Sequence, residues 1–127
     1  MAPDGEKILY KDLSYRIMGL AMQVHKELGF GFLEKVYENA LMVIFRRKVI
    51  KAIQQAPLTV HFFDEVVGEY YADIMVEDRI ILELKTVAKI TDVHRSQTLN
   101  YLKATGMKLA IILNFGKESL ESERLAY

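Results

Sequence analysis

The chain contains no cysteine among its 127 residues. A disulfide framework and a thiolate metal site are therefore both excluded, and the absence fits a reducing compartment. No apolar run approaches the roughly 20 residues that a membrane-spanning helix needs. The first seven residues, Met1–Lys7, lack the charged-then-apolar layout of a signal peptide. We therefore expect a cytoplasmic protein.

The chain also lacks an excess of charge of either sign, because 17 basic side chains balance 17 acidic ones and the net charge is zero. Proteins that bind duplex nonspecifically usually carry a basic excess, so the total gives no support to nucleic-acid binding. The charges are nevertheless segregated. Residues 62–83 hold seven acidic residues and one basic residue, whereas residues 85–108 hold five basic residues and one acidic residue. This pattern fits a cation site beside a phosphate-binding surface, and it equally fits an ordinary solvated surface.

No repeat or linker divides the sequence, and its length suits one domain. We expect that domain to span residues 1–127, with residues 1–10 and 117–127 peripheral. Helical spacing of apolar residues extends over 11–28, 32–48 and about 92–103. Alternating or continuous apolar residues, which predict strands, extend over 50–63, 66–76, 80–87 and 108–115.

The charged last dozen residues are expected to form a short helix or a frayed tail. The predicted order is α-α-β-β-β-α-β, an α/β fold with a mixed β-sheet flanked by helices.

The second and third predicted strands form a hairpin that carries carboxylates inside otherwise apolar sequence. Glu83 and Lys85 share one face of their strand, because side chains alternate. If the turn is centred on Asp78, Asp73 lies opposite Glu83, and opposed Cβ atoms are about 4.5–5.5 Å apart. The loop contains no glycine, and a slip of one residue would put the two carboxylates on opposite faces.

Two such carboxylates repel each other unless a cation lies between them. All-oxygen ligation favours a hard divalent ion such as Mg²⁺ or Mn²⁺, which can polarise a phosphoryl oxygen and lower the pKa of bound water. Lys85 would hold or deprotonate the attacking water, which is chemistry for hydrolysing a phosphodiester. An Asp and an E-x-K also occur together by chance, but Asp73 and Glu83 lie in apolar strands where unpaired carboxylates are costly.

The motifs together resemble a known family. Asp73 followed by Glu-Leu-Lys at 83–85 resembles the PD-(D/E)XK signature, although no proline precedes this aspartate. Residues 97–101, QTLNY, resemble the Q-x-x-x-Y element of the RecB and lambda-exonuclease branch. Residues 31–37, GFLEKVY, match the motif that names the GxxExxY protein family. Further segments similar to that family's pattern are Val24-His25, Gly68 to Asp73 and Leu113 to Gly116.

This resemblance, which covers residues 14–116, implies a restriction-endonuclease-like core and metal-dependent hydrolysis of nucleic acid, DNA rather than RNA. Asp73 and Glu83 would be the core metal ligands, with the backbone carbonyl of Leu84. Glu34 would be a further metal ligand, and Lys85 would be the catalytic lysine.

Gln97 and Tyr101, four residues apart on a helix, would line the site and contact substrate or orient the lysine. Several positions have a structural alternative. Glu34 could simply complement the positive start of its helix. Tyr37 is expected to be a packing residue, and His25 a hydrogen-bonded structural histidine.

A second functional hypothesis is a nucleic-acid-binding or assembly module that keeps the nuclease fold without turnover. The complete set of carboxylates and the lysine argue against it, whereas the zero net charge and the lack of a specificity domain favour it. A third is an enzyme acting on another phosphate ester. No Walker-type glycine loop is present to support ATP-driven activity. The sequence does not fix the oligomeric state and is compatible with a homo-oligomer.

Overall fold

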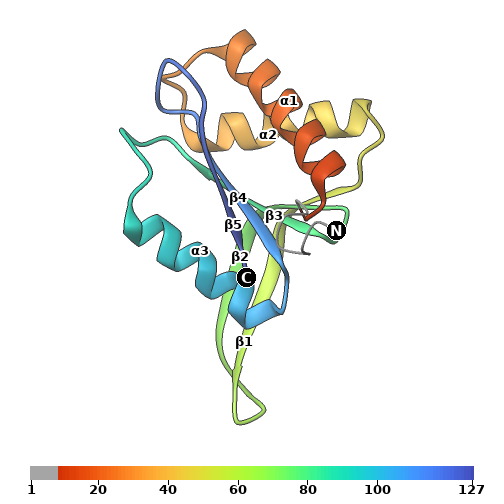
Figure 1. Ribbon diagram of the computed structural model, residues 1–127, viewed down its shortest axis with the longest axis vertical. Helices are drawn as coiled ribbons and strands as arrows, with labels where there is room; N and C mark the ends of the chain where they lie inside the picture. Colours follow the sequence, from red (N-terminus) through yellow and green to blue (C-terminus); the bar gives the residue numbers. More distant parts are fainter. Residues whose placement is uncertain (1–8) are drawn as a thin grey trace, which may run out of the picture.

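A computed structural model describes residues 9–127 as one mixed sheet of five strands with helices on both faces (Figure 1). The helices are α1 (Lys11–Leu28), α2 (Glu34–Arg47) and α3 (Asp92–Thr105). The strands are β1 (Ala52–Phe62), β2 (Glu65–Val76), β3 (Ile80–Lys85), β4 (Leu109–Asn114) and β5 (Glu121–Ala126). The expectation about a signal peptide at Met1–Lys7 falls outside the described residues.

The strands follow the chain order across the sheet, from β1 to β5. Strands β1, β2 and β3 form an antiparallel meander, and α3 then carries the chain across to β4, which lies parallel to β3. This confirms the order predicted through β4. Strands β3 and β4 are buried along almost their whole length, as the continuous apolar sequence of 109–113 indicates for a central strand.

Two apolar cores lie on opposite faces of the sheet. The larger core joins α1 and α2 to one face and includes Ile17, Phe45 and Leu82. The smaller core joins α3 to the other face and includes Ile81 and Leu102. Figure 1 shows α1 and α2 together on one side and α3 on the other. None of the helices in the described part of the chain is long and apolar enough to cross a membrane.

The prediction of a helix or tail at residues 117–127 is wrong, because residues 121–126 form β5, antiparallel to β4. The sequence ESERLA offers little apolar alternation. Pairing there satisfies the backbone groups of β4 that would otherwise be buried without partners. Charged side chains suit such an edge strand because they discourage pairing with other chains.

The turn between β2 and β3 contains no glycine and still has the predicted centre. Val76 pairs with Ile80, so the turn is centred on Asp78. Glu77 and Asp78 both have positive φ, 52° and 57°. The backbone N–H of Lys51 donates to Glu77 at 2.9 Å, and its ammonium lies 2.6 Å from Asp78. These contacts hold a turn that the sequence itself does not favour.

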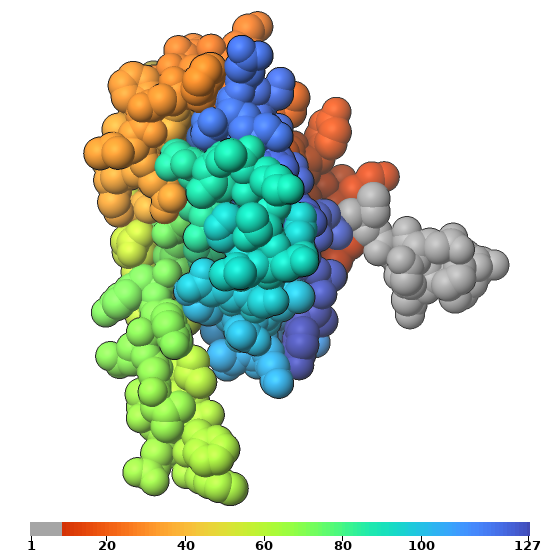
Figure 2. All heavy atoms as spheres, turned by 90° about the vertical axis from the view of Figure 1, so that its left-hand side faces the viewer, coloured from red at the N-terminus to blue at the C-terminus, as the bar shows by residue number. Residues whose placement is uncertain are grey.

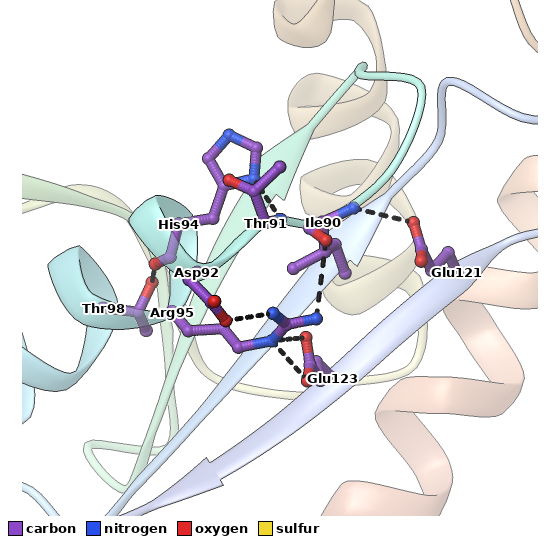
Figure 3. Close-up of polar contacts among 8 residues, drawn as sticks. All are labelled: Ile90, Thr91, Asp92, His94, Arg95, Thr98, Glu121 and Glu123. Atoms are coloured by element: carbon purple, nitrogen blue, oxygen red, sulfur yellow. Dashed lines mark hydrogen bonds and ion pairs between the residues drawn. The ribbon is translucent and has the colours of Figure 1, made fainter.

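Strand β5 also fixes the start of α3 (Figure 3). The Arg95 guanidinium contacts both oxygens of Glu123 at 2.6 Å and Asp92 at 2.7 Å. Glu121 accepts a hydrogen bond from the backbone N–H of Ile90 at 3.1 Å. Helix α3 is therefore attached to the sheet by side chains from its edge strand as well as by its apolar face.

Candidate active site

Asp73 lies at the point where the side-chain alternation along β1 and β2 reverses. The strand ladder skips the position of Gln55 and Asp73 while the pairs on either side keep the same register, and Gln55 has a φ of 53°. Ala72 packs in the core against α3, whereas Ile74, two residues later, packs in the core against α1 and α2. Side-chain alternation therefore reverses at Asp73.

The backbone pairing between β2 and β3 ends at Ile74 and Leu82. Beyond that pair, the Asp73 side chain joins the two strands. Its Oδ2 accepts a hydrogen bond from the backbone N–H of Leu84 at 2.7 Å. The carboxylate is thus attached to the strand that carries Glu83. Burial raises the pKa of Asp73, while the hydrogen bond from Leu84 acts in the opposite direction.

Glu83 is the most perturbed carboxylate in the site. It is 7% exposed, and among residues 9–127 its Oε1 is one of the buried side-chain oxygens without a hydrogen-bond partner. Burial raises the pKa of Glu83 to about 8, the charge of Asp73 raises it further, and Lys85 opposes the shift. This shift favours the protonated form of Glu83 near neutral pH.

Helix α2 brings Glu34 into the same electrostatic neighbourhood. Burial and then the charge of Asp73 raise the pKa of Glu34, and the Lys85 ammonium lowers it. Glu34 also contributes to the raised pKa of Glu83. The charges of the four residues singled out in the sequence, from α2, β2 and β3, thus act on one another.

A further carboxylate, Glu38, was not anticipated from the sequence. It is 2% exposed and contacts Lys35 at 2.8 Å and the Gln55 amide at 3.1 Å. Its charge raises the pKa of Asp73, whereas the Gln55 side chain lowers it. Spacing of four from Glu34 is the signal that could have placed it on the same helix face. Unlike Glu83 Oε1, both carboxylate oxygens of Glu38 have hydrogen-bond partners.

The end of β3 after Lys85 is clamped by the fully buried Asn114. Asn114 Oδ1 accepts from the backbone N–H groups of Val87 and Gly116 at 3.0 Å, and its Nδ2 donates to the Val87 carbonyl at 2.9 Å. The backbone N–H of Phe115 donates to the Lys85 carbonyl at 2.8 Å. These bonds fix the backbone at the lysine and in the two residues after it.

Substituting Gly116→Ala is expected to destabilise this clamp by about 1–3 kcal/mol. An added Cβ would lie 2.6 Å from the backbone nitrogen of Val87 and 2.7 Å from the carbonyl carbon of Thr86, so the backbone must shift. Gly19→Ala is the matched control, because Gly19 lies inside α1 with nothing within 4 Å of the added atom. The control should gain roughly 0.5–1 kcal/mol. Urea unfolding measures both, and equal effects would contradict the clamp.

Helix α3 places its two predicted residues on a groove beside the carboxylates. Burial raises the pKa of the Tyr101 hydroxyl, and the charges of Glu83 and Asp73 add to the shift. The charges of these two carboxyl groups therefore reach the Tyr101 hydroxyl. Gln97 lines the same groove one helical turn earlier.

The residues expected to be structural are structural. His25 Nε2 lies 2.7 Å from the carbonyl oxygen of Lys117. The Tyr37 hydroxyl donates to the Gly29 carbonyl at 2.6 Å, and its ring stacks on Phe115 with centroids 4.6 Å apart. Both side chains thus connect α1 and α2 to the end of β4.

The donor set fits a hard divalent cation on chemical grounds. Three carboxyl groups have raised pKa values, and one of them keeps a buried oxygen without a partner. A cation would compensate both features. Among residues 9–127, no three His, Asp or Glu side chains already stand as a metal-ligand set.

The family model of the PD-(D/E)XK nuclease superfamily matches residues 11–125. The chain therefore belongs to this superfamily, and the mixed sheet with its flanking helices is a restriction-endonuclease-like core. No match to the chain was found among curated proteins or among solved structures.

Proposed function

We propose that this protein hydrolyses phosphodiester bonds in DNA with Mg²⁺ or Mn²⁺ as cofactor. The observation that carries the proposal is the buried Glu83 beside Asp73 and Lys85, in a chain of the nuclease superfamily. Glu34, Asp73 and Glu83 would hold the ion together with the Leu84 carbonyl. When bound, the ion supplies charge neutralisation at the phosphate and acidification of water.

The residues of the chain would then orient the reaction. Lys85 would hold the attacking water and offset the negative charge that develops on the phosphate. Asp73 is already oriented by the Leu84 N–H. The Asn114 clamp limits movement of the strand that carries the lysine, which supports the geometry such a step needs.

Incubating the wild-type protein with linear and circular DNA tests the proposal directly. Cleavage should appear with Mg²⁺ or Mn²⁺ and disappear with EDTA. DNA binding without cleavage under every metal condition would instead favour the non-catalytic module. Cleavage that persists in EDTA would contradict a metal-dependent site. The zero net charge predicts that binding to plain duplex is weak and falls with salt.

Substituting Asp73→Asn is expected to weaken Mn²⁺ binding at least about 10-fold, because one charged ligand is lost. Isothermal titration calorimetry measures the affinity. Asp64→Asn is the matched control, since Asp64 is exposed at the tip of the β1–β2 hairpin and asparagine tolerates its positive φ of 64°. The control should bind like the wild type. Equal losses in both variants would indicate general surface acidity instead of a site.

A further inference from the structure

A groove lies between the β1–β2 hairpin and α3, beside the candidate active site. It encloses about 540 Å³, within the range of small-ligand pockets. The side chains that matter below are Tyr70, Gln97, Asn100, Tyr101 and Lys103. Figure 2 shows the face on which α3 lies next to the hairpin, whose far end projects beyond the rest of the molecule.

Two tyrosines from different elements meet in this groove. The rings of Tyr70 on β2 and Tyr101 on α3 have centroids 5.5 Å apart and planes tilted by 44°. Tyr70 remains 46% exposed, so part of its ring is available to a ligand. Nucleic-acid bases stack on exposed aromatic rings of this kind in single-strand-binding proteins.

The remaining lining suits a nucleotide better than an apolar ligand. Gln97 and Asn100 offer amide groups that can donate to and accept from base edges. Lys103 supplies a cation for a phosphate, and none of the eight lining residues is Asp or Glu. The groove is therefore free of the acidic residues that crowd the hairpin sequence around it.

The groove lies near the carboxylate site, because Tyr70 lines it three residues before Asp73 on β2. Tyr101 lines the groove, and its hydroxyl feels the charges of Glu83 and Asp73. A strand whose phosphate lies at the carboxylates would therefore place a neighbouring nucleotide against the Tyr70 and Tyr101 rings.

We propose that this groove binds an unpaired nucleotide of the DNA strand being cut, so that the protein prefers single-stranded or partly unpaired DNA to intact duplex. In a duplex each base is stacked within the helix, so it reaches neither ring. The inference rests on the proposed function for the identity of the strand. Its test measures binding and needs no cleavage.

The experiment compares binding of a labelled single strand of about 12 nucleotides and of its blunt duplex by fluorescence anisotropy in EDTA. The wild type should bind the single strand at least about 10-fold more tightly. Tyr70→Ala should weaken single-strand binding about 5- to 100-fold, the effect of losing one stacked base. Tyr70→Phe keeps the ring and should restore it.

Tyr71→Ala is the matched control, because this neighbouring, exposed tyrosine projects from the opposite face of β2. It should bind like the wild type. Equal losses for Tyr70→Ala and Tyr71→Ala, or equal wild-type affinity for single strand and duplex, would overturn the inference. Thermal unfolding of both variants excludes misfolding as the cause.

An abasic site gives a second readout. Removing the stacked base should weaken binding to the wild type and leave binding to Tyr70→Ala unchanged. Equal weakening in both proteins at every abasic position would overturn the inference. If these binding results hold while the wild type cleaves no DNA under any metal condition, the proposed hydrolysis fails and the groove inference stands.

Discussion

Replacing Lys85 with alanine is expected to reduce DNA cleavage about 100- to 10,000-fold without weakening divalent-ion binding. The ammonium group lowers the pKa of both Glu83 and Asp73, so its removal takes a positive charge away from the carboxylates proposed to bind the ion and should not weaken their attraction for a cation. The chemical step should nevertheless slow, because Lys85 is the group proposed to hold the water and offset the phosphate charge. Initial rates at saturating Mn²⁺ and calorimetry on the same samples separate the two effects.

Lys89→Ala provides the control for this experiment. Lys89 is an exposed lysine four residues along the chain, beyond the backbone that Asn114 clamps. Its removal should change the cleavage rate by less than about twofold, since only one exposed surface charge is lost. Full activity in Lys85→Ala would assign the cleavage to another site or protein. Similar losses in both variants would indicate a diffuse basic surface.

Substituting Glu83→Gln is expected to stabilise the metal-free protein at pH 9 by on the order of 3 kcal/mol while abolishing cleavage. The gain arises because the wild type must ionise a buried carboxyl whose oxygen lacks a partner. The amide removes that charge in a side chain of the same shape. Stability and activity should therefore change in opposite directions at one position.

The sign of the pH dependence follows from the two pKa values of Glu83. The pKa is about 8 in the folded protein and near the usual 4.5 when unfolded. Between these values the folded state keeps a proton that the unfolded state has lost, so the unfolding free energy falls as pH rises, by roughly 1.4 kcal/mol per unit. The contribution is fully present below pH 4.5 and lost above about pH 8.

Denaturant unfolding from pH 5 to pH 9 in EDTA measures this effect. The Glu83→Gln variant should show a clearly shallower slope, whereas Glu118→Gln, at an exposed position, should follow the wild type. Saturating Mg²⁺ should reduce the advantage of the variant, because the wild type keeps all three proposed ligand carboxylates and should bind the ion more tightly. Equal slopes for Glu83→Gln and wild type would contradict the assigned burial.

Much of the fold could be predicted because apolar residues recur at different spacings in helices and in strands. The apolar spacing of 11–28 predicts α1 with its observed bounds, and the hairpin register follows from the position of Asp78. Strand β5 could not be predicted, because backbone pairing with β4 holds it more than apolar burial does. The reversal of faces at Asp73 depends on the positive φ of Gln55, which no propensity of glutamine indicates.

The site was predictable only where residues carry a motif. Glu34, Asp73, Glu83 and Lys85 could be named from the sequence, and their charges act on one another in the structure. The groove could not, because it forms only where the twisted hairpin meets α3 and its lining residues are scattered along the chain. Contacts of this kind come from tertiary packing, which local patterns do not contain.

The parallel pairing of β3 with β4 also sets when the site can form during synthesis. Residues 34 to 85 leave the ribosome before the strand that lies beside β3, and the Asn114 clamp comes later still. A nascent chain that has emerged only as far as α3 contains every acidic residue of the site. It still lacks β4, the strand that pairs with β3 in the centre of the sheet. We therefore expect the site to take shape only after residue 116 has emerged, which delays any nuclease competence of the growing chain.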